Sequence, residues 1–253
     1  MIRTEMSRRR ALTTAAGVTA ASLATGGVLT TPAAAAPAAP GARPLENDTL
    51  KKALSDLEGR RRRLLTGRPS GNGWEMQKAF DAEGEIVTYS VPGTGLTVPL
   101  REGDAAALLV HVVRRFHYEI EALGLPGEPT PIQGWVAPSE VRDSAQPQSN
   151  QASGTAVVIR PGSYPRGVRG GLTAAQLLVV RDIIADTEGL VRWGGDDRPV
   201  QEGLFYLVAG PGDERTARVA AKLRAWREAP GLGAGVVADV TAPARRRRAE
   251  RYR

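Results

Sequence analysis

The sequence contains no cysteine, only two histidines (His111 and His117) and only four lysines among its 34 basic residues. Without cysteine, neither a disulfide framework nor a thiolate metal site can form. The two histidines are six positions apart, which would separate them by about 120° around a helix, so they cannot share a metal there. No G-x-S-x-G elbow is present, and the glycine-rich stretches "GVRGG" and "GPGDE" match no phosphate-binding loop. These absences exclude most imidazole, thiol and serine-hydrolase chemistry.

Positive charge is concentrated at the two ends of the chain. The formal net charge is +7. Residues 1–36 contain four arginines and one glutamate, and residues 245–253 contain six arginines and one glutamate. The rest of the chain is therefore close to neutral, which argues against a nucleic-acid-binding fold. The arginine-rich end, "ARRRRAERYR", is expected to be a flexible, solvated tail.

The length and composition allow one domain with a core and two tails. The chain has 253 residues, of which 42% are hydrophobic. We expect a signal peptide over residues 1–36, a linker with an amphipathic helix over residues 37–73, a main domain over residues 74–230 and the flexible basic tail over residues 231–253. In the second segment, leucines recur at helical spacing and Gly59 is expected to interrupt them.

The N-terminus has the features of an export signal. "MSRRRAL" precedes the mildly apolar run "ALTTAAGVTAASLATGGVLT", and an alanine-rich cleavage region ends near Ala35. The run is too weakly apolar for a stable transmembrane helix. "SRRRAL" resembles a twin-arginine (Tat) signal, with Ala11 in place of the usual bulky apolar residue. The alternative is a Sec signal, and either route predicts a secreted, extracytoplasmic protein.

The main domain alternates predicted strands and helices. The helices are expected to begin at Asp104, at a Thr173/Gln176 capping box and at Asp213, and the first two to end at Gly124 and Gly189. The mixed order predicts an α+β domain with a small antiparallel sheet flanked by helices. The expected strands cover residues 84–100 (two strands), 131–137, 155–160 and 204–209, and the expected helices cover residues 104–124, 173–189 and 213–229.

Two separated motifs resemble a known enzyme family. "SNQASGTAVV" (residues 149–158) resembles the S-x-H-x-x-G-x-A-x-D motif of the VanY-like zinc D-Ala-D-Ala carboxypeptidases, which have the hedgehog/DD-peptidase fold. "RWGGDDRPVQEGLFYL" (residues 192–207) resembles the family's second motif, a Trp-Gly turn followed by a D-x-x-H-F-E pattern. The resemblance spans roughly residues 130–210. It implies a hedgehog/DD-peptidase-like single domain.

The residues that the family uses for chemistry are replaced in this chain. The resemblance implies that Gln151, Val158 and Leu204 stand where the family has its zinc ligands His, Asp and His. Gln201 stands where the family has its catalytic acid. Zinc requires several strong donors and one open position for water, but valine and leucine donate nothing. We therefore expect no catalytic residues, no metal and no cofactor. The family's substrate-binding arginine would fall near Val136.

Other polar residues remain as candidates for a site. Ser149, Trp193 and Tyr206 are candidate binding residues because they lie in or beside the retained motifs. Three carboxylates in the second motif could hold a hard cation such as calcium, although a solvated turn is the simpler interpretation; they are Asp196, Asp197 and Glu202. His117 and Glu121 share a helix face and are expected to form an exposed pair.

Three functional interpretations follow from these observations. The first is an exported, catalytically inactive carboxypeptidase-like domain that binds a peptidoglycan peptide or an envelope protein in the former cleft. The second is an active cell-wall hydrolase with a non-standard site. The third is an envelope interaction protein that docks on anionic polymers or lipids through its arginine-rich tail. None of the three involves nucleic acid or a transmembrane helix.

Overall fold

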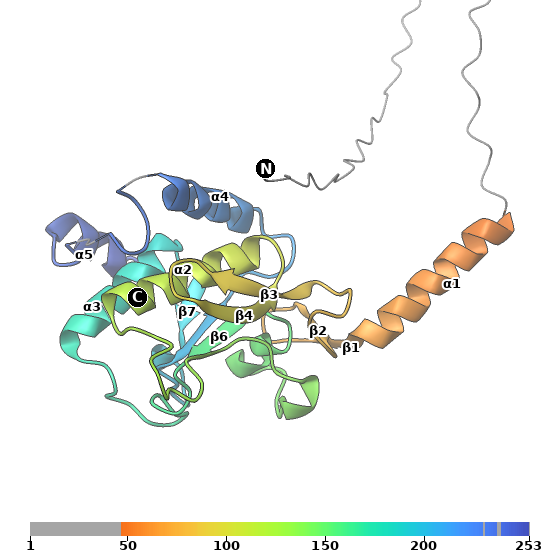
Figure 1. Ribbon diagram of the computed structural model, residues 1–253, viewed down its shortest axis with the longest axis horizontal. Coiled ribbons are helices and arrows are strands. Elements are labelled where there is room, and N and C mark those ends of the chain that lie inside the picture. The colour runs from red at the N-terminus through yellow and green to blue at the C-terminus, as the bar shows by residue number, and fades with distance from the viewer. Residues whose placement is uncertain (1–46, 230, 237–238, 253) are drawn as a thin grey trace, which may run out of the picture. The chain divides into compact units, whose positions relative to one another are not determined.

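A four-stranded antiparallel sheet lies at the centre of the fold (Figure 1). Its strand order is β5-β6-β8-β7. The strands are short and, apart from the half-buried β5, almost wholly buried: β5 (Ile132–Gln133), β6 (Ala156–Ile159), β7 (Val191–Trp193) and β8 (Leu204–Leu207). The computed structural model describes residues 47–229, 231–236 and 239–252. The expected signal peptide, residues 1–36, lies outside the described residues.

The two faces of the sheet have different neighbours. Val157 of β6 and Phe205 of β8 belong to the main hydrophobic core. Helices α2 (Asp104–Glu119) and α3 (Ala174–Asp186) cover that side, because α2 contacts β6 and β8 and α3 contacts β7. The alternate side chains of β6 and β8 form a separate apolar cluster on the opposite face, which comprises Ala156, Val158, Leu204 and Tyr206. The sheet therefore has one face that helices cover and a second face on which Ala156, Val158, Leu204 and Tyr206 form their own apolar cluster.

The described part also contains two further strand pairs and two helices that pack on α2 and α3. Strands β1 (Leu65–Pro69) and β2 (Glu75–Gln77) form one antiparallel pair. Strands β3 (Ile86–Val91) and β4 (Leu96–Arg101) form a hairpin around the expected Pro-Gly turn. Helix α4 (Glu214–Glu228) packs on α2, and α5 (Pro243–Glu250) packs on α3. The expected α+β class with small antiparallel sheets and flanking helices is confirmed.

All three helices begin at or next to the expected residues, but of the three expected N-terminal caps only those of α3 and α4 are formed. The Thr173 hydroxyl accepts a hydrogen bond from the backbone N–H of Gln176, whose side chain accepts one from the Thr173 N–H. Asp213 caps α4 by accepting from the N–H of Arg215. Asp104, however, is the first residue inside α2 and makes no capping bond; Gly103 precedes it with a φ of 89°.

Helix α2 ends five residues earlier than the sequence indicates. Its last residue is Glu119 rather than a residue near Gly124. The backbone N–H groups of Ile120 and Glu121 both donate to the carbonyl of Phe116. His117 Nδ1 accepts from the N–H of Leu123 at 3.0 Å. The side chain of His117 thus satisfies a backbone group of the following turn, and the chain leaves the helix before Gly124.

The predicted amphipathic helix is continuous. Helix α1 (Asn47–Leu64) runs through Gly59 without interruption and has no buried residue. Among the described residues, none of the helices combines the length and the hydropathy that a bilayer span requires.

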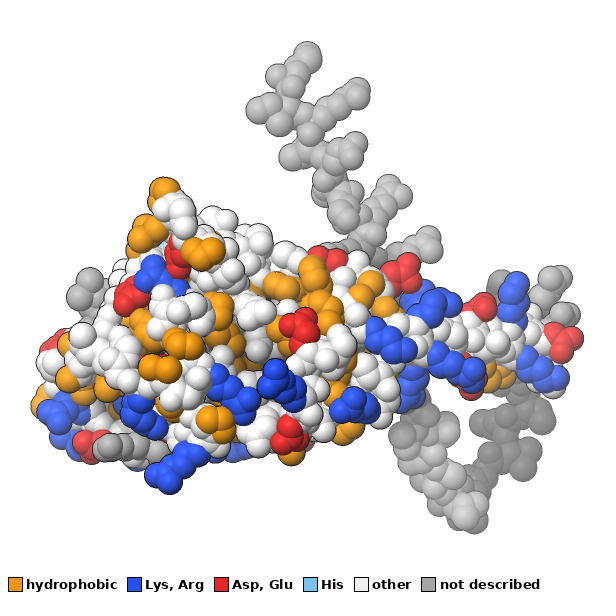
Figure 2. All heavy atoms as spheres, turned by 90° about the horizontal axis from the view of Figure 1, so that it is seen from below, with side chains coloured by type: hydrophobic (Ala, Val, Ile, Leu, Met, Phe, Trp, Pro, Cys, Tyr) orange, Lys and Arg blue, Asp and Glu red, His pale blue; other side chains and the backbone are white. Residues whose placement is uncertain are grey.

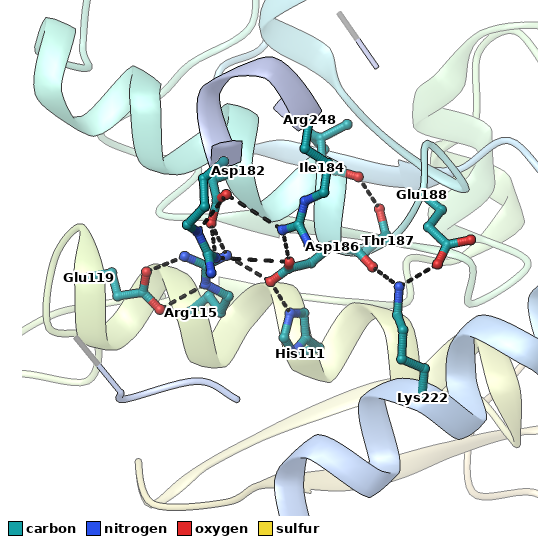
Figure 3. Close-up of polar contacts among 11 residues, drawn as sticks. His111, Arg115, Glu119, Asp182, Ile184, Asp186, Thr187, Glu188, Lys222 and Arg248 are labelled. Carbon is teal, nitrogen blue, oxygen red and sulfur yellow. Dashed lines mark hydrogen bonds and ion pairs between the residues drawn. The ribbon is translucent and has the colours of Figure 1, made fainter. Parts of the chain in front are cut away.

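The arginine-rich end forms a helix that packs on α3 where the structure describes it. Helix α5 places Arg245 and Arg248 against two buried carboxylates of α3, Asp182 and Asp186. Figure 3 shows Arg248 beside these two aspartates. Arg115 of α2 lies between these carboxylates and donates to them at 2.7 and 2.8 Å. The expectation of a solvated tail fails because burial makes unpaired carboxylates costly, and the arginines of α5 pair with them.

Candidate functional site

The stretch "SNQASGT" (residues 149–155) comprises the end of the 3₁₀ helix η2 (Pro147–Gln151) and the buried turn that leads into strand β6. Its hydroxyl and amide groups hold the loop that joins β1 to β2. The Ser149 hydroxyl accepts from the N–H of Gly71 at 2.8 Å, and the Asn150 side chain accepts from the N–H of Asn72 at 3.2 Å. Ser153 bonds the hydroxyl of Ser70 at 2.8 Å. These polar residues of the motif therefore have a structural function that requires no metal.

Gly154 is required by the backbone at this turn. Its φ is +71°, and a Cβ atom there would lie 2.6 Å from the backbone nitrogen of Arg101. Because L side chains rarely adopt positive φ and the contact involves backbone, no larger residue fits without a shift of β4. The retained glycine of the motif is thus explained by packing against the β3–β4 hairpin.

The two central ligand positions of the motifs are brought together. Val158 on β6 and Leu204 on β8 are register partners in the antiparallel pair. Directly opposed residues in such a pair have Cβ atoms about 4.5–5.5 Å apart. Both side chains are essentially inaccessible, at 1% and 0% exposure. The placement is the one that the resemblance requires, although any register pair of this sheet would give the same separation.

The other replaced positions line a cleft of about 540 Å³. Gln151 reaches it from the end of η2, and Gln201 from the loop before β8. Val136, near the position of the family's arginine, lines it as well. Ser149 also borders the cleft, although its side chain is fully buried. The tertiary structure therefore gathers residues 136, 149, 151 and 201 around one hollow.

The residues present do not fit a zinc ion. Val158 and Leu204 offer no donor atom, and they pack with Ala156 and Tyr206 as an apolar cluster. The Gln151 side chain donates to the carbonyl of Gly134 at 2.9 Å, so its nitrogen is engaged with backbone. Among the described residues, no group of three His, Asp or Glu side chains lies close enough together to hold a metal ion. No step of zinc chemistry can be built on these side chains.

The cleft offers amide groups instead. Five glutamines line it, from β5, η2 and the segments before η2 and β8: Gln133, Gln146, Gln148, Gln151 and Gln201. The Gln148 side chain donates to the Gln201 side-chain oxygen at 3.1 Å. The remaining Gln148 oxygen is buried and has no hydrogen-bond partner. Each carboxamide can donate and accept, so the lining suits a neutral ligand with its own N–H and C=O groups.

Sequence reasoning missed most of this lining. Gln133, Gln146 and Gln148 are isolated in the chain and match no motif. Arg142, Asp143 and Arg166 at the rim are likewise single charges in loops. Only the sheet pairing and the 3₁₀ turns bring them around one hollow, so no local signal could have identified them.

All three candidate binding residues have partners within the fold, and Ser149 and Trp193 show this most directly. The single O–H of Ser149 is directed to the carbonyls of Ser144 and Gln146, and its oxygen accepts from the N–H of Gly71, so its proton is already engaged within the fold. Trp193 donates its indole N–H to the carbonyl of Glu202 at 2.6 Å and lines a different cavity. The guanidinium of Arg181 lies 5.0 Å from its ring centroid. Neither residue therefore points a free polar group into the cleft.

Tyr206 belongs to the apolar cluster with Ala156, Val158 and Leu204. Its hydroxyl donates to a carboxylate oxygen of Asp197 at 3.0 Å. Burial, followed by this hydrogen bond and the charge of Asp197, raises the pKa of the Tyr206 hydroxyl well above its usual value. The phenol therefore stays protonated and anchors the loop that leads from η3 (Gly194–Asp196) to β8.

The three carboxylates of the second motif do not act together. Both terminal nitrogens of the Arg181 guanidinium pair with Asp196. Asp197 bonds Tyr206, and Arg192 lies 3.7 Å from it. Glu202 is buried and accepts from the backbone N–H groups of Gly170 and Gly171 at 2.9 and 2.7 Å. The suggested cation site is therefore wrong, and so is the solvated-turn interpretation for Glu202.

The histidines also have structural partners. His111 is buried, with its Nε2 3.3 Å from Asp186, and burial lowers the pKa of its imidazole (Figure 3). His117 accepts from the backbone N–H of Leu123, while Arg160 pairs with Glu121. The expected His117–Glu121 pair is therefore wrong, because each residue has a different partner.

Comparisons with known proteins add no assignment to this geometry. No family model, curated protein or solved structure matches this chain.

Proposed function

We propose that this protein is an exported, non-catalytic domain with a hedgehog/DD-peptidase-like frame, and that its amide-lined cleft binds a cell-wall peptide or a peptide segment of an envelope protein. One observation carries the proposal. Of the positions that the two motifs assign to ligands and acid, Gln151 and Gln201 line one cleft, and Val158 and Leu204 oppose each other on neighbouring strands.

Neutral amides at the lining favour binding over hydrolysis. A metallopeptidase needs a held ion and an activated water, which call for charged or imidazole donors. Of these positions, the two at the cleft hold glutamines, and the two in the sheet hold the apolar Val158 and Leu204. Carboxamides recognise the backbone of an extended peptide through paired N–H and C=O groups. The unpartnered oxygen of Gln148 gains a hydrogen bond when that side chain turns toward a ligand N–H.

A peptide fits the lining better than a sugar does. Of the described residues that line the cleft, none is aromatic, whereas a ring face is the usual platform for the apolar side of a ligand ring. Arg142 and Arg166 at the rim offer charged donors to a terminal carboxylate. Glu140 and Asp143 offset these charges, so the rim as a whole is close to neutral.

The test is a titration of the purified protein with a peptide that ends in D-Ala-D-Ala. Binding is monitored by calorimetry or by NMR chemical shifts. We expect saturable binding without release of D-Ala, with or without added zinc. Gln201→Leu removes one carboxamide from the half-buried lining. It should weaken binding by about tenfold, the effect of losing a hydrogen bond of about 1–1.5 kcal/mol.

A matched control lies outside the cleft. Gln176→Leu removes a carboxamide at the start of α3, away from the lining, and should leave peptide affinity unchanged. Release of D-Ala that a chelator abolishes would overturn the proposal in favour of an active hydrolase. Absence of any binding to D-Ala-D-Ala peptides and to peptides of envelope proteins would reject the cleft as a peptide site.

A further inference from the structure

Helix α1 carries a leucine stripe that no described part of the protein buries. Leu50, Leu54 and Leu57 are 46%, 53% and 60% exposed. At about 100° per residue, these three leucines and Leu64 fall within about 80° of one another around the helix. Single exposed leucines are ordinary, but a stripe along one face of an otherwise charged helix marks an interaction surface.

Basic side chains surround this stripe. Helix α1 contains six basic residues (Lys51, Lys52 and Arg60–Arg63) and three acidic residues (Asp48, Asp56 and Glu58), which leaves three net positive charges. Figure 2 shows these Lys and Arg side chains along the end of the molecule where Figure 1 labels α1. The ion pairs within the helix are exposed and span 3.8 and 3.6 Å, so they neutralise little of this charge.

We propose that α1 docks the protein onto an anionic lipid surface. The leucine stripe would enter the boundary between headgroups and acyl chains, and the lysines and arginines would lie among the lipid phosphates. An amphipathic helix with an apolar stripe and a net positive charge is complementary to such a surface. The arginine-rich α5 does not offer the same surface, because Arg245 and Arg248 are paired with Asp182 and Asp186.

The pattern of α1 fits a lipid surface better than a second helix. A coiled coil needs apolar positions sustained over at least three heptads, and the 18 residues of α1 hold fewer. Arg61 also falls within the angular range of the leucines, where a partner helix would bury its charge. At a membrane surface the same arginine can extend its guanidinium to the headgroups while its stem stays on the apolar side.

Vesicle binding of the full chain tests the proposal. Wild-type protein is mixed with vesicles of equal parts phosphatidylglycerol and phosphatidylcholine, and with vesicles of phosphatidylcholine alone. The variant carries Leu50→Gln, Leu54→Gln and Leu57→Gln, because glutamine preserves helix propensity. We expect the wild type to prefer the anionic vesicles, and the variant to bind them at least tenfold more weakly. Added salt should also weaken the wild-type binding.

The control replaces equally exposed leucines elsewhere. Leu125 and Leu232 are each 53% exposed, and Leu125→Gln with Leu232→Gln should leave vesicle binding unchanged. Circular dichroism checks that each variant keeps its helices. Equal vesicle binding by the wild type and the α1 variant overturns the proposal. A lower mass of the α1 variant than of the wild type in sedimentation, with equal vesicle binding by the two proteins, overturns it as well. The stripe would then bind a second copy of the chain.

Discussion

Val158 and Leu204 oppose each other across the β6–β8 pair, and their side chains meet in an apolar cluster with Ala156 and Tyr206. In a zinc carboxypeptidase, the resemblance would place an aspartate and a histidine at these two positions. Here the pair stabilises the sheet by burial. Substitutions at Val158 and Leu204 can therefore test whether these positions serve as a hydrophobic core or can hold a metal ion.

Val158→Asp alone should destabilise the protein strongly. The side chain is 1% exposed, so the new carboxylate would be buried without a partner. We expect a loss of about 3 kcal/mol or more in the free energy of unfolding at pH 7, measured by urea denaturation. Val158→Thr has nearly the same shape without the charge and should cost about 1–2 kcal/mol. Equal losses for the two variants would mean that the cluster is hydrated.

Restoring the three ligand positions should restore zinc binding. The variant with Gln151→His, Val158→Asp and Leu204→His should bind zinc stoichiometrically, because the register pair already holds two of the positions together. Zinc should then raise its melting temperature, since metal that binds only the folded state stabilises it. The wild type should show no such rise. A folded triple variant that binds no zinc would show that the turn at residue 151 no longer points toward the sheet.

The contact between Arg248 and Asp186 should contribute measurably to stability. Asp186 is buried and Arg248 donates to its carboxylate from α5 (Figure 3). A double-mutant cycle of Arg248→Ala and Asp186→Ala should give a coupling energy of about 1–3 kcal/mol in thermal or chemical unfolding. The exposed neighbour Arg247→Ala should change stability by less than about 0.5 kcal/mol. A coupling near zero for the first pair would mean that α5 is not held by this contact in solution.

Stability should fall in two steps as the pH is lowered. Burial lowers the pKa of His111 below 6.5 despite its hydrogen bond to Asp186. Below about pH 6.5 the unfolded chain therefore takes up a proton that the folded protein does not, and the free energy of unfolding falls. Burial alone would raise the pKa of Asp186, but the bond from His111 and the charges of Arg115 and Arg248 hold it well below 3.8. Below about pH 4 a second loss follows.

Histidine variants separate these two steps. His111→Gln should remove its share of the loss between about pH 6.5 and 5, and a smaller loss below about pH 4 should remain because Arg115 and Arg248 still lower the pKa of Asp186. His117→Gln is measured alongside, because burial also lowers the pKa of His117. Urea unfolding at half-unit pH intervals provides the data. A wild-type stability that rises as the pH falls from 7 to 5 would contradict the buried, neutral state of His111.

Gly154→Ala should cost more stability than Gly95→Ala. Both glycines have a φ of +71°, so both substitutions strain the backbone. A Cβ at Gly154 would lie 2.6 Å from the backbone nitrogen of Arg101, whereas a Cβ at Gly95 would have no atom within 4 Å. We expect about 1 kcal/mol for Gly95→Ala and at least about twice that for Gly154→Ala, by urea denaturation. Equal losses would mean that β4 moves away from the turn without cost.

The sequence by itself determined the features that depend on local chemistry. It predicted the helix starts at Thr173 and Asp213, because a side chain three or fewer residues away caps each helix. It also predicted the β3–β4 hairpin and the apolar strands β6 and β8. The placement of Val158 opposite Leu204 was expected from the family resemblance, since the two motifs carry the positions.

Only the tertiary structure decided the partners of the charged and polar residues. The arginines of α5 lie about sixty positions from Asp182 and Asp186, so no local pattern indicates that they pair. The end of α2 depends on a bond from Leu123 to His117, which overrides the glycine signal at 124. The glutamines of the cleft come from separate segments that meet only after the sheet has formed. Local spacing governs caps and strands, whereas burial and long-range pairing decide where a charge or an amide finds its partner.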